Sequence, residues 1–434
     1  MKQNKENRFS IPDPLILALG LTLVTMILAL VFGTNLRTGI LGAADVLSYW
    51  TSGFWDLLSF SMQMVLILLL GYILALSPIL DDASTVLAKL GKKPVMGAVT
   101  ISVVAIVIGL INWGLALVVG AVLVKKTAIQ AKRNGFAINY PLMGSAAYIC
   151  MMIWHGGLSG SAPLSVASEN HFLIAKTGVI PLSMTIFSPM NLTANLVLLF
   201  LLPLAVWYFA KNGENKIPGI DAFDQSDKKI NHKRSTRPGF LSIFGVLILL
   251  GLVFRLLNSG NSSIGLNEVN LILFSLVLIA FPNVESLSKA TGDAIGSTAG
   301  IIIQFPFYAG IMGIMQHSGL LAVMTDWFIT VSTRHNLPIL SLLSAGLVNL
   351  FVPSGGGQWA VQGPLIIEVA SSIGVSHAKM VMALAYGDQL TNMLQPFWAL
   401  PLLGITGLKA GEIFRYSWRF MLIGLIIFSL VLLF

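Results

Sequence analysis

The stretch PVMGAVTISVVAIVIGLINWGLALVVGAVLV, which runs from Pro94 to Val124, holds 31 residues without a charge. An apolar helix crosses the roughly 30 Å hydrocarbon layer of a bilayer in about 20 residues, so this run is too long for one ordinary span. Basic residues lie on both sides of it, at Lys92–Lys93 and Lys125–Lys126, and the positive-inside rule places both clusters in the cytoplasm. A helical hairpin that enters the membrane and returns to the same side, turning near Asn112-Trp113-Gly114, satisfies the length and the charges together.

Uncharged runs of spanning length recur along the chain, for example at Pro14–Gly33 and Leu57–Leu80. Of the 434 residues, 56% are apolar and only 10% are charged, a composition that soluble domains do not have. Transmembrane β-strands would be about ten residues long with alternating polarity, unlike these continuous Leu, Ile, Val and Gly stretches. The sequence therefore predicts an all-α polytopic membrane protein.

The formal net charge of +8 follows the predicted topology. With the N-terminus inside, 21 of the 26 lysines and arginines lie in the cytoplasm and five lie outside. We therefore interpret the positive charge as a topology signal and expect no nucleic-acid partner. The only cysteine, Cys150, excludes an internal disulfide and a cysteine-based metal cluster.

A second long uncharged run, His335–Ile367, begins outside and predicts a second re-entrant hairpin, turning near Pro353-Ser354-Gly355-Gly356-Gly357. Each half of the chain then carries a helix, a short amphipathic connector, a hairpin, an interrupted transmembrane helix and a final helix, and the two halves run in opposite senses. The predicted division is a cytoplasmic N-terminus at 1–13, a first membrane half at 14–210 with its hairpin at 94–124, a cytoplasmic linker loop at 211–237, and a second membrane half at 238–434 with its hairpin at 335–367.

Polar landmarks recur at similar spacing in the two halves. Gln63 and Asn112 are 49 positions apart, and Gln304 and Asn349 are 45 positions apart. Interrupted hydrophobic segments at matching positions of inverted halves indicate the midplane binding site of a secondary transporter. The alternative is that hydrophobic sequences resemble one another by chance.

Four stretches break helical regularity at membrane depth: INWG at Ile111–Gly114, WHGGLSGSAP at Trp154–Pro163, VPSGGGQW at Val352–Trp359 and YGDQLTNMLQPFW at Tyr386–Trp398. Backbone groups released from a helix in lipid lose several kcal/mol if they stay unsatisfied. Freed N–H groups can hold an anion, and freed carbonyls with Asn, Ser or Gln oxygens can hold a cation. This pattern is typical of a cation-coupled carboxylate carrier.

No lysine or arginine lies in the middle of a break, so neutral donors and dipoles would hold the carboxylate. Asp388, an acid at membrane depth, is expected to bind sodium or to carry a symported proton, unless its helix is offset and the acid lies at the interface. His155 is expected to be a proton relay or a substrate donor, with a hydrogen-bonded structural histidine as the alternative. The expected substrate- and ion-binding residues are Asn112, Trp113, Gly114, His155, Ser159, Ser161, Gln304, Asn349, Ser354, Gly355, Gly356, Gly357, Gln358, Asp388, Asn392 and Gln395.

Other classes of protein fit less well. An intramembrane enzyme needs a metal cluster, a paired acid and base, or a nucleophile with its base, and the chain offers none at convincing spacing. A pure scaffold would not explain the polar breaks. We expect no enzyme activity and no cofactor beyond a transported Na⁺ or H⁺, and we leave a homo-oligomer open.

The chain resembles the bacterial short-chain fatty acid transporter family, of the acetoacetate and butyrate uptake type, from Pro12 to the C-terminus. The most specific stretches are GFWDLLSFSMQM at Gly53–Met64, INWGLALVVGA at Ile111–Ala121, STAGIIIQFPFYAGI at Ser297–Ile311, VPSGGGQWAVQGP at Val352–Pro364 and YGDQLTNMLQPFWALP at Tyr386–Pro401. The resemblance implies an inner-membrane carrier within the ion-transporter superfamily that imports short-chain monocarboxylates. A dicarboxylate or amino-acid carrier of that superfamily is the alternative.

Two positions depart from the family pattern. His155 stands where a glycine is familiar in WGGG, and Asp388 stands where a glutamate is familiar. The second change keeps the acid, whereas a histidine in the site could accommodate a different or a second anionic group.

Overall fold

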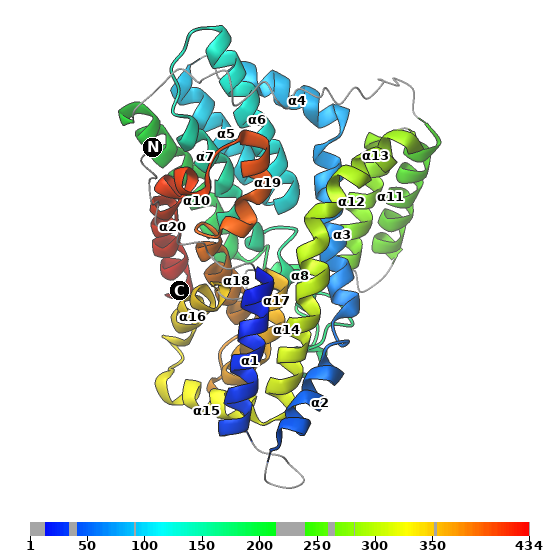
Figure 1. The fold of residues 1–434 in the computed structure, drawn as a ribbon, viewed down its shortest axis with the longest axis vertical. Coiled ribbons are helices and arrows are strands. Elements are labelled where there is room, and N and C mark those ends of the chain that lie inside the picture. The colour runs from blue at the N-terminus through cyan, green and yellow to red at the C-terminus, as the bar shows by residue number, and fades with distance from the viewer. Residues whose placement is uncertain are drawn as a thin grey trace, which may run out of the picture.

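The computed structural model describes residues 14–33, 41–90, 93–213, 239–258, 265–281, 283–350 and 354–433. The predicted N-terminal segment 1–13, nearly all of the predicted linker 211–237 and residues 351–353 of the predicted second turn lie outside these ranges. The described residues form helices joined by turns (Figure 1).

In the first half the helices are α1 (Pro14–Phe32), α2 (Ala43–Gly53), α3 (Leu58–Ala75), α4 (Pro78–Leu90), α5 (Pro94–Gly109), α6 (Trp113–Arg133), α7 (Tyr140–Tyr148), α8 (Ser161–Val166), α9 (Ile174–Thr177) and α10 (Pro189–Asn212). Short 3₁₀ helices follow α7, namely η1 (Ile149–Met152) and η2 (Trp154–Gly156), and η3 (Leu182–Met184) precedes α10.

In the second half they are α11 (Phe240–Asn258), α12 (Leu266–Ala280), α13 (Val284–Ile295), α14 (Ala299–His317), α15 (Leu320–Val331), α16 (Leu337–Asn349), α17 (Gly355–Ile373), α18 (His377–Asn392), α19 (Pro396–Thr406) and α20 (Ala410–Leu433), with η5 (Gly296–Thr298) between α13 and α14.

Six helical segments in the described part of the chain are long and apolar enough to cross a membrane: Leu58–Ala75, Trp113–Arg133, Pro189–Asn212, Phe240–Leu257, Val284–His317 and Ala410–Leu433. Four further apolar helices are shorter, at Ala18–Phe32, Pro94–Gly109, Leu266–Ala280 and Leu337–Asn349. The all-helical membrane class expected from the sequence is confirmed.

The 31-residue apolar run forms two helices, as its length requires. α5 begins at Pro94, a residue favoured in the first turn of a helix, and it ends at Gly109. Asn112 then caps α6, because its side-chain oxygen accepts the Leu115 N–H at 2.8 Å. α5 and α6 pack against each other, and the turn falls beside the predicted Asn112-Trp113-Gly114.

Several helices extend beyond the boundaries expected from apolar runs. α10 continues through Lys211, where the linker was expected to begin, and α20 begins at Ala410 rather than near Phe420. α18 runs unbroken through Asp388 to Asn392, so only Met393–Gln395 interrupts it before α19. Charged side chains at a membrane boundary do not end a helix, which is why hydropathy ended α10 too early and began α20 too late.

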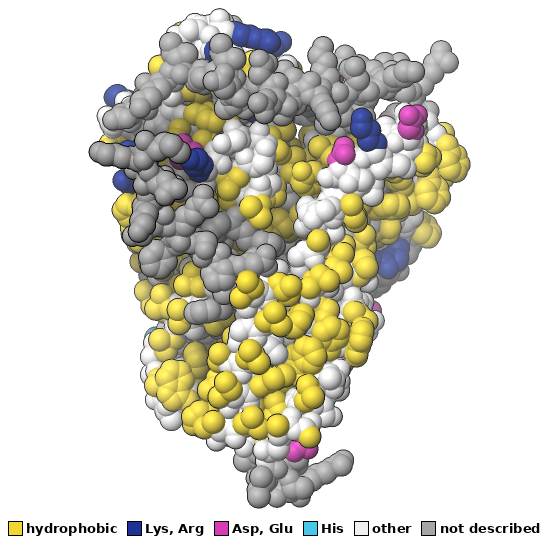
Figure 2. Space-filling view, viewed as in Figure 1, with side chains coloured by type: hydrophobic (Ala, Val, Ile, Leu, Met, Phe, Trp, Pro, Cys, Tyr) yellow, Lys and Arg dark blue, Asp and Glu magenta, His cyan; other side chains and the backbone are white. Residues whose placement is uncertain are grey.

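The helices formed by the two long uncharged runs lie in different parts of the molecule. Figure 1 shows α5 and α6 in the upper part beside α4, whereas α15 lies near the lower end with α16 above it. α4 packs on α6 and α15 packs on α17. Figure 2 shows a yellow apolar surface along α1 and α14, with the described basic side chains of this face in its upper half.

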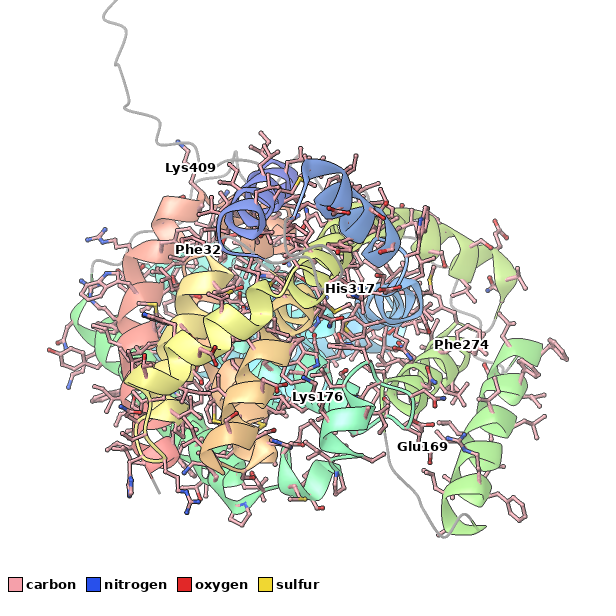
Figure 3. All side chains as sticks on the ribbon, turned by 90° about the horizontal axis from the view of Figure 1, so that it is seen from below. Phe32, Glu169, Lys176, Phe274, His317 and Lys409 are labelled. Carbon is pink, nitrogen blue, oxygen red and sulfur yellow. The ribbon has the colours of Figure 1, made fainter. Side chains whose placement is uncertain are left out.

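Helices from each half pack on a long helix of the other half. α1 and α2 pack on α14, and α12 packs on α3. Seen from below, Phe32 and His317 mark the ends of α1 and α14 on the same face (Figure 3). The α1 end lies so close that a Cβ on Gly33 would be 2.6 Å from the Ser318 carbonyl oxygen. The molecule is therefore a single interleaved helical body.

Candidate functional site

A buried contact between a histidine and an acid joins the two halves of the chain. His155 lies in η2 beyond the end of α7, and Asp388 lies one turn before the end of α18. The His155 Nδ1 atom is 2.7 Å from Asp388 Oδ2, and both side chains are fully buried. Asp388 therefore lies inside the protein rather than at a membrane surface.

The surroundings of His155 determine its tautomer. Its Nε2 accepts a hydrogen bond from the Ala162 N–H at 3.2 Å, so Nε2 carries no proton in this arrangement. A neutral ring then carries its proton on Nδ1, and this N–H donates a hydrogen bond to Asp388 Oδ2. The backbone N–H of His155 donates to the Gln389 side-chain oxygen at 3.1 Å. The His155 ring stacks on Trp154, with centroids 4.5 Å apart.

Asn349, the last residue of α16, ties the second helix pair to this acid. Its side-chain N–H group lies 2.9 Å from the Asp388 carbonyl oxygen, 2.9 Å from Thr391 Oγ1 and 2.7 Å from Asn392 Oδ1. The Asn392 amide in turn donates to Asp388 Oδ2 at 3.3 Å. The Gln395 side chain donates to the Asn349 carbonyl at 2.9 Å. This bond holds the segment between α18 and α19 against the end of α16.

Several buried polar atoms around this network have no hydrogen-bond partner among the described residues. Three are acceptors: Asp388 Oδ1, Asn349 Oδ1 and Gln358 Oε1. Two are donors: Trp154 Nε1 and Gln389 Nε2. Buried polar groups are normally paired, and an orphaned one costs about 1–3 kcal/mol. Unpaired acceptors beside a carboxylate suit a cation, and unpaired donors suit an anion.

The turn between α5 and α6 is bonded to α3 and to the segment before α8. The Asn112 amide donates to the Ile67 carbonyl of α3 at 3.0 Å, while its oxygen caps α6, so both ends of this side chain are engaged. The Trp113 N–H donates to Ser159 Oγ at 3.2 Å. The Trp113 ring packs on Trp154, which links this tip to His155.

The three glycines at the start of α17 each lie against a ring or a ring edge. A Cβ on Gly355 would be 2.8 Å from His155 Cε1, one on Gly356 would be 3.0 Å from the Phe305 ring, and one on Gly357 would be 2.3 Å from Tyr308. Ser354 caps this helix by accepting the Gly357 N–H at 3.2 Å. The glycines therefore allow the helix start to fit between His155 and α14.

The remaining expected residues lie around this centre. Gly114 approaches Leu68 of α3. Ser161 is buried at the start of α8, next to the Ala162 N–H that bonds His155. Gln304 of α14 lies 3.4 Å from the Tyr308 hydroxyl, on the helix that faces Gly357. Gln358 donates to the Ala345 carbonyl at 2.8 Å and so holds α17 on α16.

The sequence argument did not single out four residues of this network. Trp154 and Gln389 supply the unpaired donors, and Thr391 bonds Asn349. Tyr148 donates toward the Asn392 carbonyl at 2.7 Å. Three of the four lie within the quoted breaks Trp154–Pro163 and Tyr386–Trp398, so membership of a break was the available signal.

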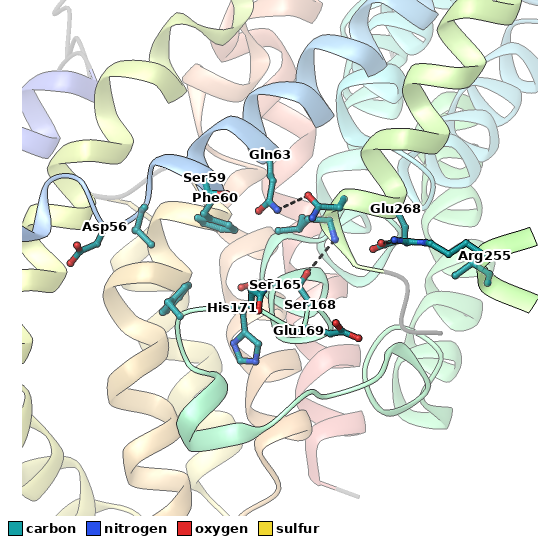
Figure 4. Close-up of a pocket in the computed structure, with 16 residues that line it drawn as sticks. Asp56, Ser59, Phe60, Gln63, Ser165, Ser168, Glu169, His171, Arg255 and Glu268 are labelled. Carbon is teal, nitrogen blue, oxygen red and sulfur yellow. Dashed lines mark hydrogen bonds and ion pairs between the residues drawn. The ribbon is translucent and has the colours of Figure 1, made fainter. Parts of the chain in front are cut away.

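A polar pocket of about 750 Å³ lies beside α8 (Figure 4). Its walls come from α3, α12, the end of α11 and the segment between α8 and α9, and Gln63 bonds Asn267 across it at 2.8 Å. Burial lowers the pKa of His171 in its wall, which favours the neutral imidazole. Ser165 of the wall and Ala162, which bonds His155, share the short helix α8.

Interrupted helices that enclose a buried acid and unpaired donors are the site architecture of membrane transporters. The sequence identifies the family. The chain belongs to the Short chain fatty acid transporter family, whose sequence pattern matches residues 5–434.

Two bacterial proteins provisionally named short-chain fatty acid transporters are similar over almost their whole length. One, from Haemophilus influenzae, is 38% identical over 425 residues, covering 94% of this chain and 92% of that protein. The other, from Escherichia coli K12, is 35% identical over 429 residues, covering 96% and 95%.

Two solved transporters share the fold at 15% sequence identity. The YdaH transporter of Alcanivorax borkumensis, described as having an unusual topology, has a TM-score of 0.66 and coverage of 97% of this chain and 98% of its own. MtrF of Neisseria gonorrhoeae, described among antimetabolite efflux pumps, has a TM-score of 0.52 and coverage of 98% and 95%.

Proposed function

We propose that this protein is a secondary active transporter of the bacterial inner membrane that imports short-chain monocarboxylates such as butyrate and acetoacetate together with H⁺ or Na⁺. The observation that carries the proposal is that unpaired acceptors and unpaired donors both lie around the buried contact between His155 and Asp388. The provisional names of the two relatives support the substrate class.

The carboxylate is proposed to bind the donors. Trp154 Nε1 and Gln389 Nε2 are buried N–H groups without partners among the described residues, and an anion held by such donors needs no salt bridge. A short apolar tail suits the aromatic wall of Trp113, Trp154 and Trp398, whose ring centroids lie 4.8 to 6.4 Å apart. A dicarboxylate would bury a second charge against these rings, which is costly.

The coupling cation is proposed to bind at Asp388. Its Oδ1, with Asn349 Oδ1 and Gln358 Oε1, provides oxygen atoms of the kind that hold a hard cation, and a proton on the carboxylate would satisfy the same charge. Because His155 donates to Oδ2, its role in this proposal is to orient the acid. Asn112 and Ser354, both used as helix caps, hold the tips rather than the substrate.

We propose that α5–α6 and α16–α17 are re-entrant hairpins of two inverted repeats. The support is a set of matching contacts: α3 packs on α6 as α14 packs on α17, α5 packs on α7 as α16 packs on α18, and α4 packs on α6 as α15 packs on α17. In this proposal the pocket at α8 is the outer vestibule, and hairpin movement opens the buried centre to it.

Uptake into proteoliposomes tests the function. We expect labelled butyrate to accumulate against its gradient when a proton or sodium gradient is imposed, and unlabelled acetoacetate to compete. Labelled succinate or an amino acid accumulating in preference to butyrate would support the alternative dicarboxylate or amino-acid carrier instead.

A further inference from the structure

A cluster of arginines and aromatic rings lies on the outer surface where α10 and α20 pack together. Arg419 of α20 lies over three rings, with its guanidinium carbon 4.8 Å from the Trp418 centroid, 5.5 Å from that of Phe209 in α10 and 5.8 Å from that of Tyr416. Arg415 is exposed one turn earlier on α20, and its carbonyl accepts a hydrogen bond from Arg419 at 2.6 Å. Rings on three sides hold Arg419 in place.

Neither arginine has an acidic partner in the described part of the chain. Glu412, the acid nearest along α20, accepts the Lys409 N–H at 2.8 Å and so caps the helix start. Most of the guanidinium N–H groups are therefore free for an anion. An arginine fork matches the oxygens of a phosphate group.

The cluster lies at the depth of lipid headgroups. The last apolar run of the chain, Phe420–Phe434, starts directly after Arg419, and that of α10 ends at Ala210. Phe209 joins both helices at this level, because its ring contacts Arg419 and packs on Tyr416 with centroids 6.0 Å apart. Tryptophan is enriched at this level of the membrane, and Trp418 is 43% exposed.

The supporting rings are fixed from inside the protein. The Tyr416 hydroxyl accepts a hydrogen bond from the Asn139 amide at 2.8 Å, and Tyr416 is buried. Tyr416 and Phe209 therefore form a rigid base under Arg419. A preorganised cation loses less entropy on binding than a free surface side chain.

We propose that Arg415 and Arg419 form a binding site for the phosphate of an anionic phospholipid, with the acyl chains lying along the exposed apolar side chains of α10 and α20. Basic pockets between transmembrane helices are known to bind lipid headgroups of this charge. A zwitterionic lipid presents the same phosphate with a compensating cation, so it should bind less tightly.

The test counts lipids on the full-length protein by native mass spectrometry, with phosphatidylglycerol or phosphatidylcholine added to the detergent-purified carrier. We expect phosphatidylglycerol to be retained preferentially, and Arg415→Gln with Arg419→Gln to weaken its retention by about fivefold for each arginine lost. Arg415→Lys with Arg419→Lys keeps the charge without the fork and should retain part of the preference. This lysine variant serves if the glutamine variant does not fold.

Two comparisons make the result decisive. Lys132→Gln with Arg133→Gln removes two charges at the end of another helix, α6, and should leave the lipid preference unchanged. Equal retention of the two lipids, or equal loss in both glutamine variants, would overturn the proposal. Displacement of the lipid by millimolar inorganic phosphate would do so as well, because it would identify a free-anion site.

Discussion

His155 and Asp388 are in direct contact through a 2.7 Å hydrogen bond between Nδ1 and Oδ2. They are 233 positions apart in sequence, and they come from the broken helices of opposite halves. The pair acts as one unit in the packing of the site.

The contact predicts a coupled substitution. His155→Gly alone leaves a cavity and an acid without its donor, and Asp388→Glu alone overpacks a fully buried site. We expect each single variant to lose butyrate uptake by about tenfold or more, since a hydrogen bond to a charged group contributes roughly 1.5–3 kcal/mol. The double variant should recover most of the loss, measured as initial uptake rates in proteoliposomes. Additive losses in the double variant would show that the two side chains are not coupled.

Asp388→Asn tests the coupling ion. If a proton is carried, the neutral amide should abolish concentrative uptake but keep substrate exchange, because exchange moves the loaded carrier both ways without proton release. If sodium is bound, the variant should need a higher sodium concentration for half-maximal uptake, since the amide keeps an oxygen and loses the charge. Counterflow and concentrative uptake of butyrate over a sodium series at two pH values separate the cases. Wild-type behaviour in both assays would remove Asp388 from the mechanism.

Asn112 and Asn349 should behave differently although the proposed inverted repeat places them at matching positions. Asn112→Ala removes a helix cap and a bond to α3, so we expect a loss of about 1–3 kcal/mol in stability and a lower melting temperature in detergent. Its half-saturation concentration for butyrate should stay near that of the wild type.

Asn349→Ala should instead raise the half-saturation concentration for butyrate or for the coupling ion, because its Oδ1 is unpaired and its amide holds the Asp388 segment. Asn134→Ala, at the exposed end of α6, is the matched control and should change neither quantity. The reverse result, with affinity lost in Asn112→Ala alone, would place the substrate at the first tip.

Gly357→Ala should damage the second helix pair. Its Cβ would lie 2.3 Å from the Tyr308 ring, which forces a shift of α17 or α14 and costs about 1–3 kcal/mol. Gly292→Ala in α13 meets no atom within 4 Å, and it should be neutral or slightly stabilising because alanine favours helix. Melting temperatures and uptake of the two variants check this, and similar behaviour of both would contradict the observed packing.

The hairpin proposal predicts which side of the membrane each connection faces. Cys150 is fully buried, so it should react slowly with maleimides and leave a low background. Single cysteines introduced at Lys93 and Asn134 should both label only from the cytoplasm, and one at Ser371 only from outside. Opposite sides for the first two would make α5–α6 a pair that crosses the membrane once, and the inverted repeat would be lost with it.

The sequence alone determined the helical membrane class, because uncharged runs such as Pro94–Val124 must satisfy their backbone hydrogen bonds within a helix. It also determined the turn at Asn112, since length and flanking charge leave few other places for it. The quoted breaks contain most of the residues that meet at the centre. Helix ends such as those of α10 and α20 were missed, because charge marks the membrane boundary rather than the end of the helix.

The tertiary structure decided which of the expected residues face one another. Nothing in the sequence shows that His155 bonds Asp388, because the contact joins segments from opposite halves. Asn112 and Asn349 look equivalent in sequence, yet one has both polar groups engaged and the other has an unpaired oxygen. Hydrogen-bond satisfaction depends on which backbone groups approach in space, and only packing determines that.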